Sequence, residues 1–145
     1  MPYFPRPMNP GPSSLSLSAF AALRDLAREH PVEVTVRGGC MAPLLADGER
    51  VVVAPARAYW PGDVVVFQTA DGRLLVHRLL GWRPWAGFPA FVTQGDGCPC
   101  HDAPVPRSRL LGRVIAPERA RPGLSDRLRA CAAFFRLAGR RLGRR

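Results

Sequence analysis

Between residues 32 and 116 the chain carries short apolar or alternating stretches of the kind that form β-strands. Val32, Val34 and Val36 show this alternation, and the apolar runs that follow are separated by turns rich in glycine, proline and aspartate. This pattern predicts strands at residues 32–36, 50–54, 64–67, 74–80, 88–93 and 110–116. The short Asp71-Gly72 connection indicates that the third and fourth of these strands form a hairpin.

At both ends of this β region the apolar spacing changes to that of a helix. Residues 15–29 and 124–142 place apolar side chains three and four positions apart, and each stretch is predicted to form one helix. Residues 1–14 include five prolines and are expected to form a disordered lead. We therefore expect three parts: the lead, a mainly β domain with its N-terminal helix at 15–116, and a helical tail at 117–145.

Length and composition are those of a single domain. The chain has 145 residues, and 47% of them are hydrophobic, which is enough for one core. It contains no run of eighteen apolar residues, so no transmembrane helix is expected. Residues 15–23 are too short and too interrupted by serine to form a signal peptide. We therefore expect a cytoplasmic protein whose four cysteines are thiols.

The net charge of +10 is concentrated in the tail. Residues 117–145 carry nine arginines and two acidic residues, whereas residues 1–116 carry twelve arginines and nine acidic residues. All 21 basic residues are arginines, which do not deprotonate in proteins. A general base therefore has to be His30, His77, His101 or a carboxylate.

One cysteine stands in a tight turn directly after the first strand. Gly38 and Gly39 let the backbone bend, Cys40 follows at the bend, and Pro43 prevents an immediate return to regular structure. A nucleophile on a sharp turn is accessible and held in one direction. The segment is also compatible with a small cysteine that only packs against its neighbours. His77, inside the strand at 74–80, allows the same two interpretations, a base or a structural histidine.

Five short motifs follow one another in a fixed order. They are Cys-Met-Ala-Pro at 40–43, Gly-Asp-Val-Val at 62–65, His-Arg at 77–78, Thr-Gln-Gly-Asp at 93–96 with a second aspartate at 102, and Gly-Arg-Val at 112–114. Over residues 34–115 this series resembles the signal peptidase-like S24/S26 superfamily, in particular its archaeal and endoplasmic-reticulum branch. The resemblance implies a coiled β-sheet of the LexA/signal peptidase type with a helix on either side. It also implies an endopeptidase that cuts a peptide or precursor protein beside small residues.

The same resemblance implies roles for individual residues. Cys40 takes the position of the nucleophile, and His77 takes that of the general base. Asp102 takes the position that orients and stabilises the histidine, with Asp96 as the alternative. The absence of lysine excludes the serine–lysine dyad of the bacterial type I branch, and no cofactor is implied.

The turn around the nucleophile departs from the family's chemistry. Cysteine replaces serine, and a cysteine beside His77 can form a thiolate–imidazolium pair. Gly38 stands where the family often has a serine whose hydroxyl supports the oxyanion hole. That task then passes to backbone N–H groups of the turn around Gly38 and Gly39. Met41 and Pro43 fall at substrate-binding positions, and the membrane anchor of signal peptidases has no counterpart.

The irregular loop predicted at residues 94–107 contains a further cysteine pair. Cys98, Cys100 and His101 could bind zinc together with Cys131, form a redox pair, or be ordinary loop thiols. Ligands spaced as Cys-x-Cys-His lie too close together to complete a tetrahedron unaided. We therefore assign no metal to them.

The tail helix is basic and amphipathic. Its predicted apolar face consists of Leu128, Cys131, Ala132, Phe135, Ala138 and Leu142. Arg129, Arg136 and Arg140 lie on the opposite face. The helix can pack on the protein's own β core or lie on an anionic membrane surface, which would make the protein peripheral at the inner membrane face. Nucleic acid is disfavoured as a partner because no base-stacking motif accompanies the charge.

Three functions remain open at this point. The favoured one is a peptidase with a Cys40 nucleophile acting on a peptide or precursor protein. The second is a catalytically inactive relative that binds a peptide or partner in the same groove. The third is a surface-binding protein whose function resides in the tail.

Overall fold

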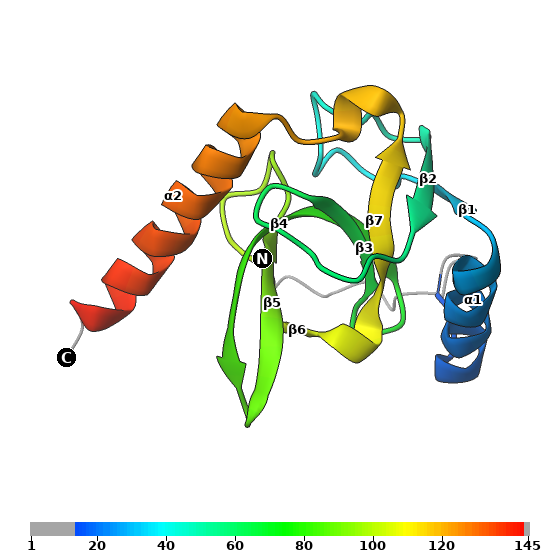
Figure 1. The fold of residues 1–145 in the computed structure, drawn as a ribbon, viewed down its shortest axis with the longest axis horizontal. Helices are drawn as coiled ribbons and strands as arrows, with labels where there is room; N and C mark the ends of the chain where they lie inside the picture. The colour runs from blue at the N-terminus through cyan, green and yellow to red at the C-terminus, as the bar shows by residue number, and fades with distance from the viewer. Residues whose placement is uncertain (1–13, 144–145) are drawn as a thin grey trace, which may run out of the picture.

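The structure is a computed structural model that describes residues 14–143, so nearly all of the predicted lead lies outside the described residues. Its helices and strands are α1 (Leu17–Glu29), β1 (Val32–Thr35), β2 (Arg50–Ala54), β3 (Val64–Gln68), β4 (Leu74–Trp85), β5 (Phe88–Gln94), β6 (Val105–Pro106), β7 (Leu110–Ala116) and α2 (Leu124–Leu142). Short 3₁₀ helices at Arg107–Arg109 and Glu118–Ala120 flank β7. The seven strands form one antiparallel sheet in the order β1-β2-β7-β3-β4-β5-β6 (Figure 1).

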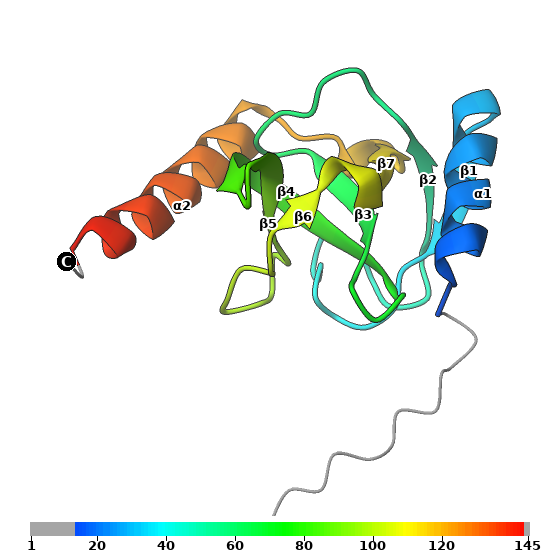
Figure 2. The same cartoon turned by 90° about the horizontal axis from the view of Figure 1, so that it is seen from below.

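The sheet curls on itself, with α1 beside β1 and β2 and α2 on the opposite side of the molecule (Figures 1 and 2). The central strand β3 is buried along its whole length, so apolar residues face a core on each side of it. Val64 and Val66 belong to the core that includes Phe20 of α1, whereas Val65 and Phe67 belong to a second core on the other face. The prediction of a mainly β chain with a helix at each end is confirmed.

Three predicted strands, at 32–36, 64–67 and 88–93, differ from the structure by one residue at their C-terminal end, and two larger differences concern β4 and β6. The strand predicted at 74–80 continues to Trp85, because β4 and β5 stay paired up to Trp85 and Phe88. Ala86 and Gly87 close this hairpin with positive φ angles of 49° and 83°, the geometry of a two-residue turn that follows the twist of the strands. The predicted loop at 94–107 contains β6, which pairs with β5 and buries Val105.

The tail helix packs on the sheet through a different face from the predicted one. Ala130 is buried, and Ala133, Phe134 and Leu137 are partly buried against β4 and β5. Gly81 of β4 makes room for this contact, because a Cβ there would lie 2.6 Å from the Phe134 ring.

The predicted apolar face of α2 is largely open. Leu128 is 61% exposed and Phe135 is 71% exposed, and the Leu142 side chain lies outside the described part. The helix therefore carries two apolar stripes, and the periodicity did not reveal which of them meets the sheet. Among residues 14–143, no helix combines the length and the apolar character needed to cross a membrane.

Candidate functional site

Cys40 lies in the turn between β1 and β2. Gly38 adopts a φ of +79°, and its N–H donates to Asp47 Oδ1 at 2.9 Å, which fixes the start of the turn. Met41 is only 1% exposed and anchors the turn in the core. Cys40 itself is exposed. The turn therefore exposes a thiol at the surface, while the Asp47 hydrogen bond and the buried Met41 side chain fix its backbone.

His77 lies on β4, directly across from Val65 of β3, and is 4% exposed. Its Nδ1 lies 2.5 Å from Asp102 Oδ2. The Phe67 ring packs edge-on against the imidazole, with the ring centroids 5.9 Å apart. Because Asp102 occupies Nδ1, Nε2 is the ring nitrogen that remains for Cys40. Asp102 thereby sets both the tautomer and the direction of the ring.

Asp102 is held in place by β5. Thr93 Oγ1 donates to the same carboxylate oxygen at 2.7 Å, and the Asp102 N–H donates to the Thr93 carbonyl at 2.8 Å. Thr93 is fully buried. Thr93 was not among the predicted site residues, although its place at the start of the Thr-Gln-Gly-Asp motif could have pointed to it.

A second thiol, that of Cys98, completes the cluster. The sulfur atoms of Cys40 and Cys98 and a ring nitrogen of His77 all lie within 4.8 Å of one another. Gly95 permits this approach, because a Cβ there would lie 2.7 Å from both the Cys40 carbonyl oxygen and Cys98 Sγ. The Gly97 N–H donates to the Cys40 carbonyl at 2.9 Å, so the loop after β5 packs directly on the Cys40 turn.

The other two cysteines and His101 do not join this arrangement. In the described part of the chain, Cys98 clusters with Cys40 and His77 rather than with Cys100, His101 and Cys131. Spacing along the sequence groups Cys98 with its neighbours Cys100 and His101 in the loop. The contact with Cys40 depends on tertiary packing between two loops more than fifty residues apart.

These groups shift one another's pKa values. The pKa of Cys40 is lowered, chiefly because the Cys98 thiol hydrogen-bonds to it and then because His77 does. Burial acts to lower the pKa of His77, but the hydrogen bond and the charge of Asp102 outweigh burial and raise it. Burial, followed by the hydrogen bond to Cys40, raises the pKa of Cys98 to about 11. The cluster therefore favours a Cys40 thiolate beside a protonated His77 and a protonated Cys98.

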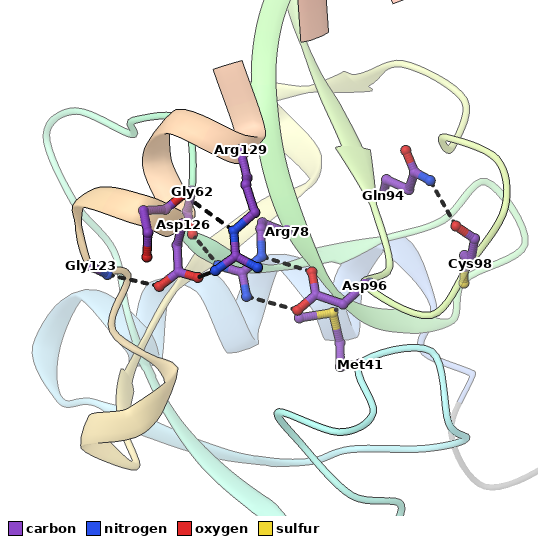
Figure 3. A network of polar contacts seen from close by, with 10 residues as sticks. Met41, Gly62, Arg78, Gln94, Asp96, Cys98, Gly123, Asp126 and Arg129 are labelled. Atoms are coloured by element: carbon purple, nitrogen blue, oxygen red, sulfur yellow. Dashed lines mark hydrogen bonds and ion pairs between the residues drawn. The ribbon is translucent and has the colours of Figure 1, made fainter. Parts of the chain in front are cut away.

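Asp96, the alternative partner for the histidine, is bound by Arg78 (Figure 3). Arg78 Nε donates to one carboxylate oxygen at 2.7 Å and Nη2 donates to the other at 2.8 Å, which is a bidentate pair. The Asp96 N–H also contacts Met41 Sδ at 3.5 Å. Of the two aspartates that the sequence left open, Asp102 contacts His77, whereas Asp96 ties the loop to β4 and to the turn.

The remaining predicted residues lie in the Cys40 turn with different environments. The Gly38 N–H is occupied by a carboxylate and is not free for an oxyanion. The N–H groups of Gly39 and Cys40 make no hydrogen bond within residues 14–143. Met41, predicted to contact a substrate, is buried beneath the turn instead. Pro43, predicted to do the same, is exposed and lines a groove.

This groove has a volume of about 650 Å³ and lies between the turn, the loop after β5 and the first half of α2. Its charged residues are four arginines and two aspartates, namely Arg78, Arg119, Arg129, Arg136, Asp96 and Asp126. Asp96 is paired with Arg78, and Asp126 is paired with Arg129 at 3.4 Å. The groove is therefore net positive, and Arg136 adds a charge that neither aspartate balances.

No protein-family model matches this chain, and no curated protein matches it either. A functional assignment therefore rests on the geometry of Cys40, His77, Asp102 and Cys98 and on the groove that Ala42 and Pro43 of the Cys40 turn help to line.

Proposed function

We propose that the chain is a peptidase of the signal peptidase-like S24/S26 type that cleaves a peptide or precursor protein with Cys40 as nucleophile. The observation that carries the proposal is the series of Asp102, buried His77 and exposed Cys40. Nucleophilic hydrolysis needs a nucleophile, a base within its reach and a third group that orients the base. The curled antiparallel sheet is compatible with the LexA/signal peptidase-like fold that the motifs suggest.

The proposed reaction begins with the Cys40 thiolate attacking the carbonyl carbon of the scissile bond. The unbonded N–H of Cys40 donates to the oxygen that becomes negative in the tetrahedral intermediate. His77 then donates its proton to the leaving amine, and an acyl thioester remains on Cys40. Water that gives a proton to His77 attacks this thioester, and the product acid leaves with the thiolate restored.

The groove lined by Ala42 and Pro43 of the Cys40 turn supports a preference for acidic peptides. A segment lying between Pro43 and α2 passes Arg136, whose charge is not balanced by the aspartates of the lining. An acidic side chain a few residues from the scissile bond would meet this charge. The small residues beside the cleaved bond are expected from the family resemblance alone.

Alkylation with iodoacetamide, followed by peptide mass spectrometry, tests the nucleophile without knowledge of the substrate. Cys40 should react fastest of the four thiols near neutral pH, because the thiolate is the reacting form. Cys100, which is also exposed, is the matched control for accessibility. Equal rates at Cys40 and Cys100 would contradict an activated nucleophile.

Cleavage itself is tested on a library of peptides that carry alanine or glycine at the centre and acidic residues at varied positions. The wild-type chain should cut a subset of these peptides, and Cys40→Ala should cut none while keeping its circular dichroism spectrum. Cys40→Ser restores the family's oxygen nucleophile and should retain a small fraction of the activity. Equal cleavage by wild type and Cys40→Ala would show that another group or a contaminant cuts.

A catalytically inactive peptide-binding protein is the second candidate. One observation favours it: the Gly38 N–H is occupied by Asp47, which removes one donor from the neighbourhood of the developing oxyanion. Such a protein would bind the acidic peptides of the same library, as measured by fluorescence anisotropy, and leave them intact. It would also bind equally well after Cys40→Ala.

The exposed stripe of α2 supports attachment to an anionic membrane surface as an accompanying property. Leu124, Leu128 and Phe135 are 75%, 61% and 71% exposed, and arginines lie beside them on the same helix. Apolar side chains that enter the interface and arginines that contact lipid phosphates are the two elements of such binding. Attachment would place the protein peripherally at the inner membrane face.

A further inference from the structure

We infer that Cys40, His77 and Cys98 form a binding site for a thiophilic divalent metal ion, with Zn²⁺ as the reference ion. Two cysteine sulfurs and one imidazole nitrogen are a donor set that zinc, among common biological cations, prefers. The three donor atoms lie within 4.8 Å of one another. They come from the turn after β1, from β4 and from the loop after β5, so three different parts of the chain surround one point.

The dimensions of the cluster match a tetrahedral ion. Zinc–sulfur bonds of about 2.3 Å and zinc–nitrogen bonds of about 2.0–2.1 Å place tetrahedral ligand atoms roughly 3.5–3.8 Å apart. The donors, at most 4.8 Å apart, therefore have to approach by at most about 1.3 Å, and rotation of the exposed Cys40 and the half-buried Cys98 side chains can supply that movement. Because Cys40 is exposed, solvent can supply a fourth ligand.

The environment of His77 also fits a metal ligand. A metal-binding histidine almost always donates its other ring N–H to a carboxylate or carbonyl, which fixes the ring and raises the basicity of the ligating nitrogen. Asp102 Oδ2 occupies Nδ1 of His77 at 2.5 Å, and Thr93 holds that carboxylate at 2.7 Å. Nε2, the free nitrogen, is then the ligand.

The loop after β5 offers an alternative set of metal ligands, and variants distinguish it from the proposed one. Cys98 lies two residues before Cys100 and three before His101, and a site built on those residues would use the same thiol without Cys40 or His77. Cys100→Ala and His101→Ala should leave binding unchanged if the proposed set is correct. Cys40→Ala and Cys98→Ser should each weaken it.

Metal binding has a consequence for the proposed reaction, and this part rests on the proposed function. The ion replaces the protons of His77 and of the Cys98 thiol, which pass to the buffer, and it occupies the Cys40 sulfur that would attack the substrate. A metal-loaded protein would therefore be an inactive peptidase that a chelator reactivates.

The binding test uses the full chain, reduced with a phosphine and freed of metal, and titrates it with Co²⁺. Tetrahedral cobalt with two thiolates gives intense visible ligand-field bands and a sulfur-to-metal charge-transfer band, and we expect both to saturate at one ion per chain. Zn²⁺ should then displace the cobalt and abolish the colour. Binding should weaken about 10–100-fold in Asp102→Asn, which alters only the group behind His77.

The variants decide the outcome. A reduced or absent charge-transfer band in Cys98→Ser and in Cys40→Ala, with the wild-type spectrum kept in Cys100→Ala, supports the site. Wild-type spectra in both Cys40→Ala and His77→Gln, or no saturable cobalt spectrum in the wild type, would overturn it. Because these readouts need no substrate, a failure of the peptidase proposal leaves them intact. Conversely, cleavage that Zn²⁺ does not inhibit, without a cobalt spectrum, would refute the metal site alone.

Discussion

Gly95 lies against Cys40 with no room for a side chain between them. A Cβ at Gly95 would be 2.7 Å from the Cys40 carbonyl oxygen and 2.7 Å from Cys98 Sγ. Gly95→Ala should therefore push the loop away from the turn and separate the two thiols. We expect a loss of roughly 1–3 kcal/mol in the free energy of unfolding, as in other overpacked sites, and slower alkylation of Cys40.

Gly97→Ala is the matched control for this change. A Cβ at Gly97 would lie 3.4 Å from its nearest neighbour, the Gly39 carbonyl oxygen, which is ordinary contact. This variant should keep both the unfolding midpoint in urea and the alkylation rate of Cys40 close to wild type. If Gly95→Ala and Gly97→Ala behave alike, the close contact between the loop and the turn does not govern the thiol.

Substitution of Asp102 should mainly lower the cleavage rate, whereas substitution of Asp96 should mainly lower the free energy of unfolding. Asp102→Asn takes away the carboxylate that holds Nδ1 of His77, and cleavage should fall by roughly 10²–10⁴-fold through the wrong tautomer. Asp96→Asn breaks the bidentate pair with the largely buried Arg78 and should cost about 1–3 kcal/mol in unfolding free energy. Urea unfolding and initial cleavage rates, measured on both variants, separate the two roles. A larger cleavage defect in Asp96→Asn than in Asp102→Asn would contradict the assignment.

Cys98 should set the pH at which Cys40 becomes reactive. The pKa of Cys40 lies below its ordinary value of 9.0, and the first cause is the hydrogen bond from Cys98. The rate of alkylation rises as the pH rises through the pKa of Cys40, since the thiolate reacts. Cys98→Ala removes the donor, so the midpoint of the rate profile should move to higher pH. Cys98→Ser keeps a donor and should move it less; an unchanged midpoint in Cys98→Ala would show that His77 alone activates the thiol.

The strands were predictable because each is a short, apolar or alternating run bounded by turn residues. Residues 50–54 and 110–116 form β2 and β7 with the predicted bounds. The second half of β4 was missed because Gly81 and Pro84 usually interrupt strands. In the structure β4 continues past both residues, because it stays paired with β5 through a register shift between Leu79 and Gly81. β6 is two residues long and is defined by its partner strand, so its own sequence carries almost no signal.

Site residues that belong to a sequence motif could be predicted, whereas contacts that arise from tertiary packing could not. The motifs pointed to Cys40, His77 and Asp102, and the structure brings their side chains together. The place of Cys98 depends on the fold of a loop that closes over the turn, and the burial of Met41 depends on the core beneath it. Neither property is encoded in local spacing, which is why both differ from the sequence-based expectation.

The exposed stripe of α2 gives a prediction about membrane binding. Leu128→Ser combined with Phe135→Ser should weaken sedimentation with vesicles of phosphatidylglycerol by roughly tenfold or more, because two apolar side chains no longer enter the interface. Both positions are more than half exposed, so the fold should be retained, as circular dichroism can check. Ala132→Ser, on the same stripe and also exposed, is the matched control and should bind like wild type. Neutral phosphatidylcholine vesicles should bind the wild type weakly, because the arginines then meet no net anionic charge. Equal binding of the double variant and the wild type to anionic vesicles would mean that charge alone holds the protein there.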